Sequence, residues 1–226
     1  MATDRDQRLR ALEAALLYFV CDGLPEGRKA GPLLDAAIQG GAGIVQLREK
    51  SPRRPEELIA LADPFRRAAA EHQALFILND RPDLVAACGA DGVHVGQEDM
   101  PVAQARQLAG PEALVGLSTH SPQQVEAACA AAGMDRPDQI SVGPVWATPT
   151  KEGRPGTGLG LIEYAAREAT VPWFAIGGID TRNVSSVVAA GAQRIVVVRA
   201  IRDAEDPASA ARRLHEALEA SVGAPR

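Results

Sequence analysis

The sequence contains few cysteines, and they lie far apart. Three are present in 226 residues, Cys21, Cys88 and Cys129. An odd number of widely spaced thiols without a C-x-x-C pair indicates neither a disulfide framework nor a thiolate zinc site. We therefore interpret the three side chains as packing residues.

Excess positive charge and long apolar segments are also absent from the sequence. Lys and Arg number 24 against 29 Asp and Glu, which gives a formal net charge of -5 and a pI near 5.4. This balance argues against a nucleic-acid-binding surface, which needs clustered cations on one face. No apolar run approaches the ~20 residues of a membrane span, and no N-terminal stretch has the pattern of a secretory leader. We expect a soluble, cytoplasmic protein without nucleic-acid or membrane partners, in which any anion site is local.

Short β-like runs repeat along the chain. Hydrophobic residues make up 46% of the sequence, which is enough for a sizeable core in one domain, 1–226. Apolar runs rich in β-branched residues alternate with Ala-rich amphipathic stretches, a pattern typical of βα units on a parallel sheet. The eight predicted strands are Leu16 to Cys21, Gly43 to Leu47, Ala74 to Leu78, Gly92 to Val95, Ala113 to Leu117, Gln139 to Val142, Val171 to Ile176 and Arg194 to Val198.

The stretches between the strands have helical patterns with recognisable ends. Ser121 and Asp180 are predicted N-caps, and Gly133 and Gly191 are predicted C-terminal stops. The clearest predicted helices are Pro55 to Glu71, Ser121 to Ala132, Asp180 to Ala190 and Pro207 to Ala220.

Eight such units predict a (β/α)8 TIM barrel, whose usual size is about 250 residues. The alternative is an open doubly wound sheet, which would gather its ligand groups at one switch point, whereas here polar clusters follow nearly every strand. Residues 1–15 are predicted to form a short extra N-terminal helix that closes the barrel bottom. Residues 16–222 would form the barrel, and 223–226 a frayed tail.

The first polar cluster follows the second predicted strand. In Gln46-Leu47-Arg48-Glu49-Lys50 the strand period of two places Gln46, Arg48 and Lys50 on one side. An amide and two cations at this spacing can follow a chain of phosphate oxygens, because Arg gives forked hydrogen bonds and Lys a point charge. The alternative is a solvated strand end with Arg48 and Glu49 in a surface ion pair.

Two acidic residues follow neighbouring predicted strands. Asp80 comes after the third strand, next to Asn79, and Asp99 follows the fourth. Adjacent barrel strands would bring the two carboxylates together, and like charges at short range are costly unless a cation lies between them. A pair of hard oxygen ligands suits Mg²⁺, which also binds substrate phosphates. Alternatively, each acid is a helix N-cap, because a proline follows two positions later.

Two further patterns suggest a cofactor but lack the rest of the motif. His94 has no second histidine at ligand spacing, so we interpret it as a packed, hydrogen-bonded residue rather than a zinc ligand. The glycine-rich stretch from Gly153 to Gly160 does not directly join a strand to a helix, and no Walker lysine follows it. We interpret it as a mobile loop able to close over a ligand.

Two later segments have the composition of anion sites. After the sixth predicted strand, Thr148, Thr150 and Lys151 supply two hydroxyls and an ammonium, although an ordinary Pro-rich loop has similar residues. Gly177-Gly178 follows the seventh strand. In (β/α)8 barrels the loops after strands seven and eight form the usual phosphate site, because glycine lets backbone N–H groups approach the oxygens.

Taken in order, these segments resemble the thiamine-phosphate synthase family. The resemblance runs from about Tyr18 to Ile201. Each segment alone is common, but the ordered combination is specific. The segments that carry it are Gln46-x-Arg48-x-Lys50, Asn79-Asp80, Gly92-Val93-His94-Val95-Gly96-Gln97-x-Asp99, Gly116-Leu117-Ser118, Gly143-Pro144-x-x-x-Thr148-x-Thr150-Lys151 and Ile176-Gly177-Gly178-Ile179.

The resemblance implies a transferase that joins hydroxymethylpyrimidine diphosphate to hydroxyethylthiazole phosphate, giving thiamine phosphate and pyrophosphate. By similarity, Asp80 and Asp99 would hold Mg²⁺. The residues expected to hold the pyrimidine diphosphate are Gln46, Arg48, Lys50, Asn79, Ser118 and Lys151. Those expected to contact the thiazole phosphate are Thr148, Thr150, Gly178, Val198 and Arg199.

The residues present suit this chemistry. The thiazole nitrogen attacks through a lone pair and has no proton to lose, so no general base is needed. Catalysis by Arg48, Lys50 and Lys151 would consist of easing pyrophosphate departure together with Mg²⁺, while the site holds the two rings in line. This favours a largely dissociative displacement through a pyrimidine cation.

One position departs from the family pattern, and two other functions are open. The family often has Ser where this chain has Arg199, so a side-chain hydroxyl contact would be lost there but a backbone contact would persist. A related thiazole tautomerase would need neither a diphosphate site nor a metal, and a non-catalytic sensor would bind a phosphorylated ligand without turnover. The joint presence of Arg48, Lys50, Asp80, Asp99 and Lys151 favours the synthase. The sequence does not indicate an oligomeric state.

Overall fold

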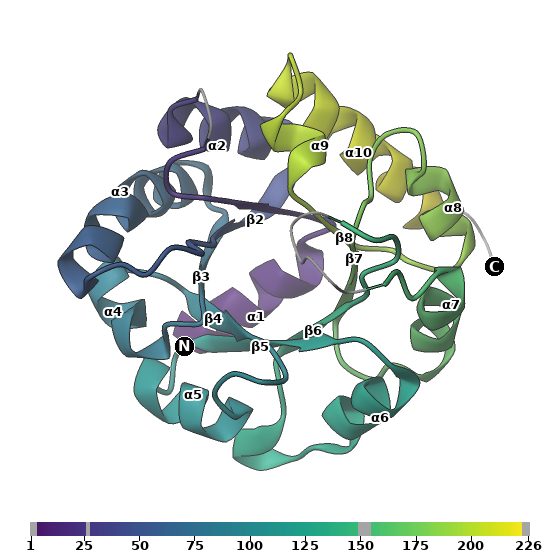
Figure 1. Ribbon diagram of the computed structural model, residues 1–226, viewed down its shortest axis with the longest axis horizontal. Helices are drawn as coiled ribbons and strands as arrows, with labels where there is room; N and C mark the ends of the chain where they lie inside the picture. Colours follow the sequence, from purple (N-terminus) through teal and green to yellow (C-terminus); the bar gives the residue numbers. More distant parts are fainter. Residues whose placement is uncertain (1–3, 26–27, 149–154, 223–226) are drawn as a thin grey trace.

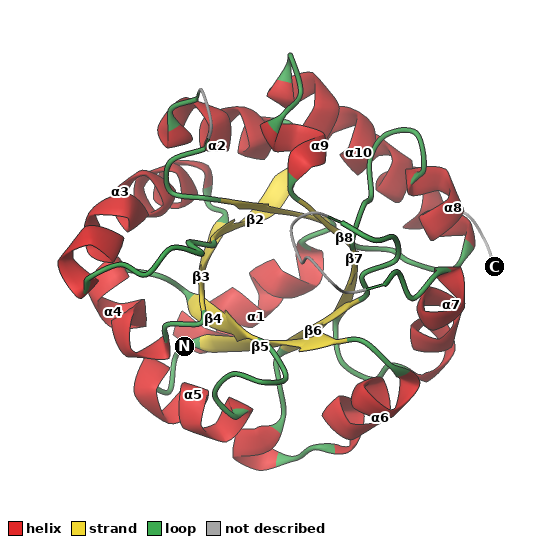
Figure 2. Cartoon of the chain, viewed as in Figure 1, coloured by secondary structure: helices red, strands yellow, loops and turns green. Residues whose placement is uncertain are grey.

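The protein is a ring of strands surrounded by helices. The structure, a computed structural model, describes residues 4–25, 28–148 and 155–222 (Figure 1). Within these ranges the strands form a closed parallel barrel in chain order, drawn as the inner ring in Figure 2. They are β1 (Leu17–Cys21), β2 (Ala42–Leu47), β3 (Leu75–Asn79), β4 (Gly92–Val95), β5 (Leu114–Thr119), β6 (Gln139–Val142), β7 (Trp173–Ile176) and β8 (Ile195–Val197).

Closure of the ring decides between the two predicted folds. β1 pairs in parallel with β8, with Leu17 opposite Ile195, as well as with β2. An open sheet would have two edge strands paired on one side only, whereas here each strand pairs with two neighbours. The (β/α)8 barrel is therefore confirmed and the open doubly wound sheet is wrong. β7 begins at Trp173, two residues after the predicted start, because Pro172 has no N–H to donate to the ladder.

Helices cover the outside of the barrel and cross its bottom (Figure 1). No helix in the described ranges is both long and apolar enough to span a membrane. The helices are α1 (Asp4–Ala14), α2 (Ala30–Gln39), α3 (Pro55–His72), α4 (Val85–Cys88), α5 (Val102–Ala109), α6 (Pro122–Ala130), α7 (Leu159–Glu168), α8 (Val184–Ala189), α9 (Arg199–Arg202) and α10 (Pro207–Val222), with 3-10 turns η1 (Pro82–Leu84) and η2 (Gly133–Asp135).

Local side-chain chemistry sets several helix ends, not always as predicted. Ser121 caps α6, since its hydroxyl accepts a hydrogen bond from the Gln124 backbone N–H. Asp180 does not cap α8. Its carboxylate binds Arg182 at 2.6 Å, and the helix begins at Val184, four residues after the predicted start, with Asn183 at the N-cap position.

The two predicted glycine stops behave differently. Gly191, with φ +101°, directly follows Ala190, the C-cap residue of α8, as a helix stop should. Gly133 lies in η2, beyond the end of α6 at Ala130, so the prediction that it stops that helix is wrong.

Side chains alternate between two cores along each strand. On β2, Val45 and Leu47 belong to the outer core between the strands and the helices. Ile44 belongs to the inner core, and Gln46 lines a cavity inside the barrel. This follows from the strand period of two, which sends successive side chains to opposite faces. The inner face therefore decides what the barrel can bind.

The inner face changes from apolar to polar along the barrel axis. Its lower part is filled by Tyr18, Ile44, Leu75, Leu114 and Phe174. The buried polar side chains of its upper part are Gln46, His94, Ser118, Gln139 and Ser141. The apolar half stabilises the closed ring, and the polar half faces the carboxyl ends of the strands, where barrels bind their ligands.

Helix α1 closes the barrel at its amino end. The side chain of Leu12 is 2% exposed and belongs to the inner core. Arg5 donates to the Ala113 carbonyl at 2.8 Å, and Arg8 pairs with Asp91 at 2.9 Å, just before β5 and β4. The extra N-terminal helix predicted at the barrel bottom is therefore confirmed. Residues 223–226, the predicted tail, lie outside the described residues.

Candidate active site

A cavity of about 300 Å³ opens at the carboxyl ends of the strands. Most strands contribute to its wall, because each ends at the same rim. Among the lining residues are eight that the sequence predicted: Gln46, Arg48, Asn79, Ser118, Thr148, Gly178, Val198 and Arg199. The structure thus brings together side chains that lie as many as 153 positions apart, from Gln46 to Arg199.

Gln46 is fixed in the cavity wall by a buried tyrosine. Its amide Nε2 donates to the Tyr18 hydroxyl at 2.6 Å. Tyr18 packs edge-on against Phe174, with ring centroids 5.6 Å apart, and burial raises the pKa of its hydroxyl. Tyr18 therefore stays protonated and holds the Gln46 amide in one orientation.

Arg48 is a half-buried cation at the rim. Its backbone N–H donates to the Cys21 carbonyl at 3.0 Å, which extends the β1–β2 ladder by one residue. Burial lowers the pKa of the guanidinium, and the carboxylates of Asp80, Asp22 and Asp99 oppose that shift. Arg48 therefore keeps its positive charge at the cavity wall.

The alternative surface ion pair for the β2 segment is not present. Glu49 pairs with Arg53 at 3.7 Å and accepts from the Ser51 N–H at 3.0 Å, so Arg48 is left facing the cavity. Lys50, the third member of the predicted cluster, is exposed and is not one of the residues that line the cavity.

Asp80 and Asp99 meet beside Arg48, as predicted. Asp80 adopts a left-handed backbone conformation, φ +59°, which is uncommon outside glycine and is held by a hydrogen bond from its N–H to the His94 carbonyl at 3.0 Å. Asp99 Oδ2 accepts from the Gly96 N–H at 2.7 Å. Neither residue is the N-cap of the next helical turn, so the capping alternative is wrong for both.

The two carboxylates repel each other. Partial burial and then the negative charge of Asp99, which lies within hydrogen-bond reach, raise the pKa of Asp80 to about 6, against weaker effects of Arg48 and Asn79. Two acids this close need a shared proton or a cation between them. Hard oxygen donors beside an anion-binding cavity fit Mg²⁺.

The loops after β6 and β7 pack together on the other side of the cavity. Val145 donates its N–H to the Ile176 carbonyl at 2.8 Å, and Trp146 donates to the Gly177 carbonyl at 3.2 Å. Gly177 has φ +109°, and a Cβ there would lie 2.4 Å from Pro144 Cβ. Only glycine fits this turn, which keeps backbone N–H groups at the cavity wall.

The Asn183 side chain holds the glycine turn through two hydrogen bonds. Its Nδ2 donates to the Gly178 carbonyl at 2.8 Å, and its Oδ1 accepts from the Asp180 N–H at 2.9 Å. Val198 and Arg199 follow β8 and complete this wall, with the Arg199 side chain exposed. The loop after β7 supplies backbone N–H groups beside its glycines, and the loop after β8 supplies an arginine. Together they give this side of the cavity the composition of an anion site.

Part of the predicted site lies outside the described residues. This holds for Thr150, for Lys151 and for Gly153 at the start of the predicted mobile loop. The described end of that loop is attached to the β6 loop, since Thr157 donates its N–H to the Pro144 carbonyl at 2.8 Å. Gly160 lies within α7, so the predicted loop is too long at this end.

The sequence did not identify several residues of the site, and His94 and Ser141 in the cavity wall are among them. Tyr18 and His120 line the cavity, and the strand period of two contained a signal for both, because Tyr18 precedes Val20 on one face and His120 follows Ser118. Arg182 also lines the cavity, and Asp22 lies near Arg48. Nothing in the local sequence distinguishes these two from ordinary surface residues.

A larger cavity, of about 580 Å³, lies at the opposite end of the barrel beside α1. Its arginines already have protein partners. Arg106 pairs with Asp138 at 3.0 Å and donates to the Arg136 carbonyl at 2.6 Å, while Arg5 also binds Asp138. These contacts stabilise the amino end of the barrel, which is the structural rather than the catalytic face of this fold.

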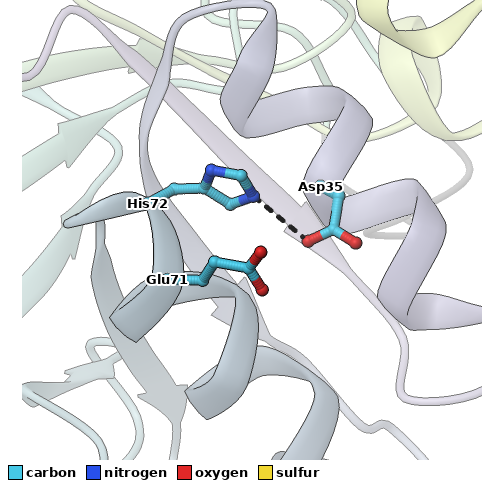
Figure 3. A group of neighbouring side chains, drawn as sticks. All are labelled: Asp35, Glu71 and His72. Atoms are coloured by element: carbon cyan, nitrogen blue, oxygen red, sulfur yellow. Dashed lines mark ion pairs between the residues drawn. The ribbon is translucent and has the colours of Figure 1, made fainter.

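A second group of potential ligands lies in the outer helical layer (Figure 3). One ligand atom each of Asp35, Glu71 and His72 lies within 4.8 Å of the others. His72 Nε2 is 3.4 Å from Asp35 Oδ1, which links α3 to α2, and His72 also complements the carboxyl end of the α3 dipole. None of the three lines the strand-end cavity.

Comparison with known proteins shows the family of this chain. The family model described as thiamine monophosphate synthase matches residues 17–201. The thiamine-phosphate synthase of Arthrobacter sp. is 47% identical over 93% of this chain and 97% of its own length. That of Acidothermus cellulolyticus is 47% identical over 89% of this chain and 93% of its own. The structure of thiamine phosphate pyrophosphorylase from Pyrococcus furiosus has a TM-score of 0.82 and 29% identity, over 95% of this chain and all of that one.

The fold and the cavity define a (β/α)8-barrel enzyme with a polar cavity at the carboxyl ends of its strands. Within that class, the chain belongs to the thiamine monophosphate synthase family, whose members are transferases.

Proposed function

We propose that this chain makes thiamine phosphate. In the proposed reaction, the nitrogen of 4-methyl-5-(2-phosphooxyethyl)thiazole attacks the methylene carbon of 4-amino-2-methyl-5-(diphosphooxymethyl)pyrimidine. A C–N bond forms, the C–O bond to the diphosphate breaks, and its electron pair leaves with pyrophosphate. The thiazole nitrogen has no proton to lose, so the reaction requires no base.

The observation that carries the proposal is the convergence of predicted polar residues from distant segments on one cavity. Gln46, Arg48, Asn79 and Ser118 line one side, next to the Asp80–Asp99 pair, and we assign the pyrimidine diphosphate to them. Gly178, Val198 and Arg199 line the other side, with Thr148, and we assign the thiazole phosphate to them. Two phosphorylated substrates in one cavity can be held with their reacting atoms in line, which removes much of the entropic barrier.

The protein's own contribution to the chemical step is charge stabilisation. Arg48 is half-buried, so its charge acts on the departing diphosphate with less screening than in water. Lys50 and Lys151 are proposed to add to this charge. Such groups lower the barrier to diphosphate departure more than they strengthen attack, which supports a largely dissociative displacement through a pyrimidine cation.

Asp80 and Asp99 are proposed to hold Mg²⁺. Burial and then the negative charge of Asp99 raise the pKa of Asp80, and a bound cation would favour the charged form of both carboxylates. When bound there, the ion would neutralise charge on the diphosphate. The two acids would otherwise repel that group, so the metal also makes the site compatible with its substrate.

Thr150 is proposed to contact the thiazole phosphate beside Thr148. We also propose that residues 1–226 work as one barrel domain in the cytoplasm, with the two phosphorylated substrates as the partners of the site.

Pyrophosphate release tests the proposal. The purified chain is mixed with both substrates and Mg²⁺, and pyrophosphate is measured by a coupled assay. We expect release only in the complete mixture, and none when either substrate is omitted or when EDTA is added. An Arg67→Gln variant, altered on the exposed face of α3, serves as a matched cation control and should keep wild-type turnover.

The other two functions give different results in the same assay. A thiazole tautomerase would convert its substrate without releasing pyrophosphate, and a sensor would bind a phosphorylated ligand and release nothing. Either result would contradict the synthase assignment.

A further inference from the structure

His94 lies at the centre of a buried polar network in the cavity wall, which His94, Ser118 and Ser141 line. Its Nε2 is 3.0 Å from Ser118 Oγ, and its Nδ1 is 3.0 Å from Gln139 Nε2. Ser141 Oγ lies 3.4 Å from Ser118 Oγ and 3.5 Å from the His94 ring. All four side chains are at most 8% exposed, so their hydrogen bonds cannot be exchanged freely for bonds to water.

The donors and acceptors of this network fix where its protons lie. The Gln139 amide nitrogen is only a donor, so His94 Nδ1 must accept from it. The neutral ring then has its proton on Nε2, which donates to Ser118 Oγ. Ser141 also directs its hydroxyl at Ser118 Oγ. The Ser118 oxygen therefore accepts hydrogen bonds from His94 and Ser141, and its own O–H proton is available to the cavity that it lines.

The reverse arrangement would present the opposite polarity to the cavity. If the Gln139 carbonyl faced Nδ1, the ring proton would lie on Nδ1, and Ser118 would donate to Nε2 and offer only lone pairs upward. In the observed arrangement Gln139 Oε1 is buried without a hydrogen-bond partner among the described residues. An unpaired carbonyl is the lesser cost, because buried N–H groups without partners are rarer than underused carbonyls.

Gly116 provides the space for this network. A Cβ at position 116 would lie 2.1 Å from Gln139 Nε2 and 2.5 Å from His94 Nδ1. No other residue can occupy this position without separating the two groups. The glycine therefore lets the amide and the imidazole meet inside the barrel.

We propose that His94 and Gln139 are positioning residues that make the Ser118 hydroxyl an obligate hydrogen-bond donor toward the cavity. Ser118 would then pair with an acceptor atom of the pyrimidine diphosphate and reject a donor at the same place. This assignment rests on the proposed function, but the proton positions can be measured without turnover.

The proton positions are tested by ¹⁵N NMR of the imidazole rings at pH 8, where a histidine with the ordinary pKa of about 6.5 is neutral. The His94 signals are identified by their loss in His94→Gln. We expect a neutral ring protonated on Nε2 in the wild type, and a second tautomer in Gln139→Met. Protonation on Nδ1 in the wild type would overturn the proposal, and an unchanged spectrum in Gln139→Met would remove Gln139 from it.

The link to catalysis is tested by a double-mutant cycle. His94→Met removes the donor to Ser118 and should lower kcat/KM for the pyrimidine diphosphate by about tenfold. His94→Gln keeps one donor and one acceptor and should retain most of the activity. In a Ser118→Ala background His94→Met should have no further effect, because its partner is already gone. An equal loss in both backgrounds would show that His94 does not act through Ser118.

Thr119→Val is the matched control for folding. Thr119 is fully buried on the same strand and donates to the Ser141 carbonyl at 3.0 Å, but it is not part of the network. This variant should lose stability and keep its kcat/KM. If the wild type releases no pyrophosphate while His94 has the expected tautomer, the proposed function fails and the proton arrangement stands.

Discussion

Arg48 is the residue whose charge matters most for the proposed reaction. It lies half-buried in the cavity wall, and burial lowers its pKa, so the fold keeps a desolvated cation that it does not need for stability. Charged side chains that are kept in place despite an unfavourable burial are typical of binding and catalytic sites. The same reasoning explains why Asp22, Asp80 and Asp99 surround it.

Replacing this cation separates activity from stability. Arg48→Gln should lower kcat by about 100-fold or more, the usual effect of losing one group that stabilises charge in the transition state. Thermal unfolding should change little or improve, because an unfavourable burial is removed. Steady-state kinetics and calorimetry check both parts, with Arg67→Gln as the exposed control. Wild-type kcat in Arg48→Gln would remove this residue from the mechanism.

Asp80 gives the metal-free protein a predictable pH dependence. Its folded pKa of about 6 lies above the ordinary 3.8, so the folded state binds the proton more tightly than the unfolded chain. The resulting stabilisation is present below about pH 4 and is lost as the pH rises through about 6. Asp80→Asn should therefore equal the wild type near pH 4 and exceed its stability at pH 7, as measured by urea unfolding in EDTA.

A neighbouring acid provides a control of opposite sign. The hydrogen bond from Arg81 lowers the pKa of Asp83, so this carboxylate stabilises the fold above its ordinary pKa and loses that effect in acid. Asp83→Asn should therefore be less stable than the wild type at pH 7. If both variants changed stability at pH 7 in the same direction, the carboxylate repulsion at Asp80 would not be the cause.

Among the loops, the turn after β7 most clearly requires its sequence. Gly177 combines a positive φ with a close approach to Pro144. Gly177→Ala should raise KM for the thiazole phosphate about tenfold or more. It should also lower the free energy of unfolding by more than the roughly 1–3 kcal/mol that the strained backbone conformation alone would cost.

Gly110 is the matched control for this turn. It has φ +94° after α5 but open space at its Cβ position. Gly110→Ala should lower the free energy of unfolding only by the cost of the backbone conformation, and KM should not change. Equal unfolding energies and equal KM values for the two variants would mean that packing against Pro144 does not shape the site.

Helix α1 is expected to affect stability rather than catalysis. Leu12 fills the amino end of the inner core, about the length of a strand away from the polar residues of the other end. Leu12→Ala should lower the free energy of unfolding by about 2–5 kcal/mol and leave kcat unchanged. Leu108→Ala, at a side chain 51% exposed on α5, should change the unfolding energy by less than about 0.5 kcal/mol. A large loss of kcat in Leu12→Ala would mean that the two ends of the barrel are coupled.

Across the whole molecule, stability and function occupy opposite ends of one barrel. The sequence predicted this architecture because apolar strand runs and helix ends are local signals. Eight alternating strand and helix units in order are compatible with few topologies. It also predicted eight residues of the cavity wall, since polar residues after parallel strands must meet at one rim. The closeness of Asp80 and Asp99 followed from the adjacency of β3 and β4.

What the sequence did not predict depends on contacts between distant segments. Asp180 has the composition of an N-cap, but Arg182 takes its carboxylate. The orientation of Gln46 depends on its hydrogen bond to Tyr18, whose ring packs against Phe174 from a distant strand. The His94 network joins three strands, and no local pattern shows that an amide from β6 reaches an imidazole from β4.

The most direct test of the central claim is the ratio of thiamine phosphate formed to pyrophosphate released in one reaction mixture. Both products are quantified by mass spectrometry and a coupled assay after the chain is mixed with the two substrates and Mg²⁺. A metal-dependent cavity that joins the two rings predicts equal amounts of the two products, and neither of them in an Asp80→Asn/Asp99→Asn variant. Pyrophosphate without thiamine phosphate, or wild-type yields in the double variant, would contradict it.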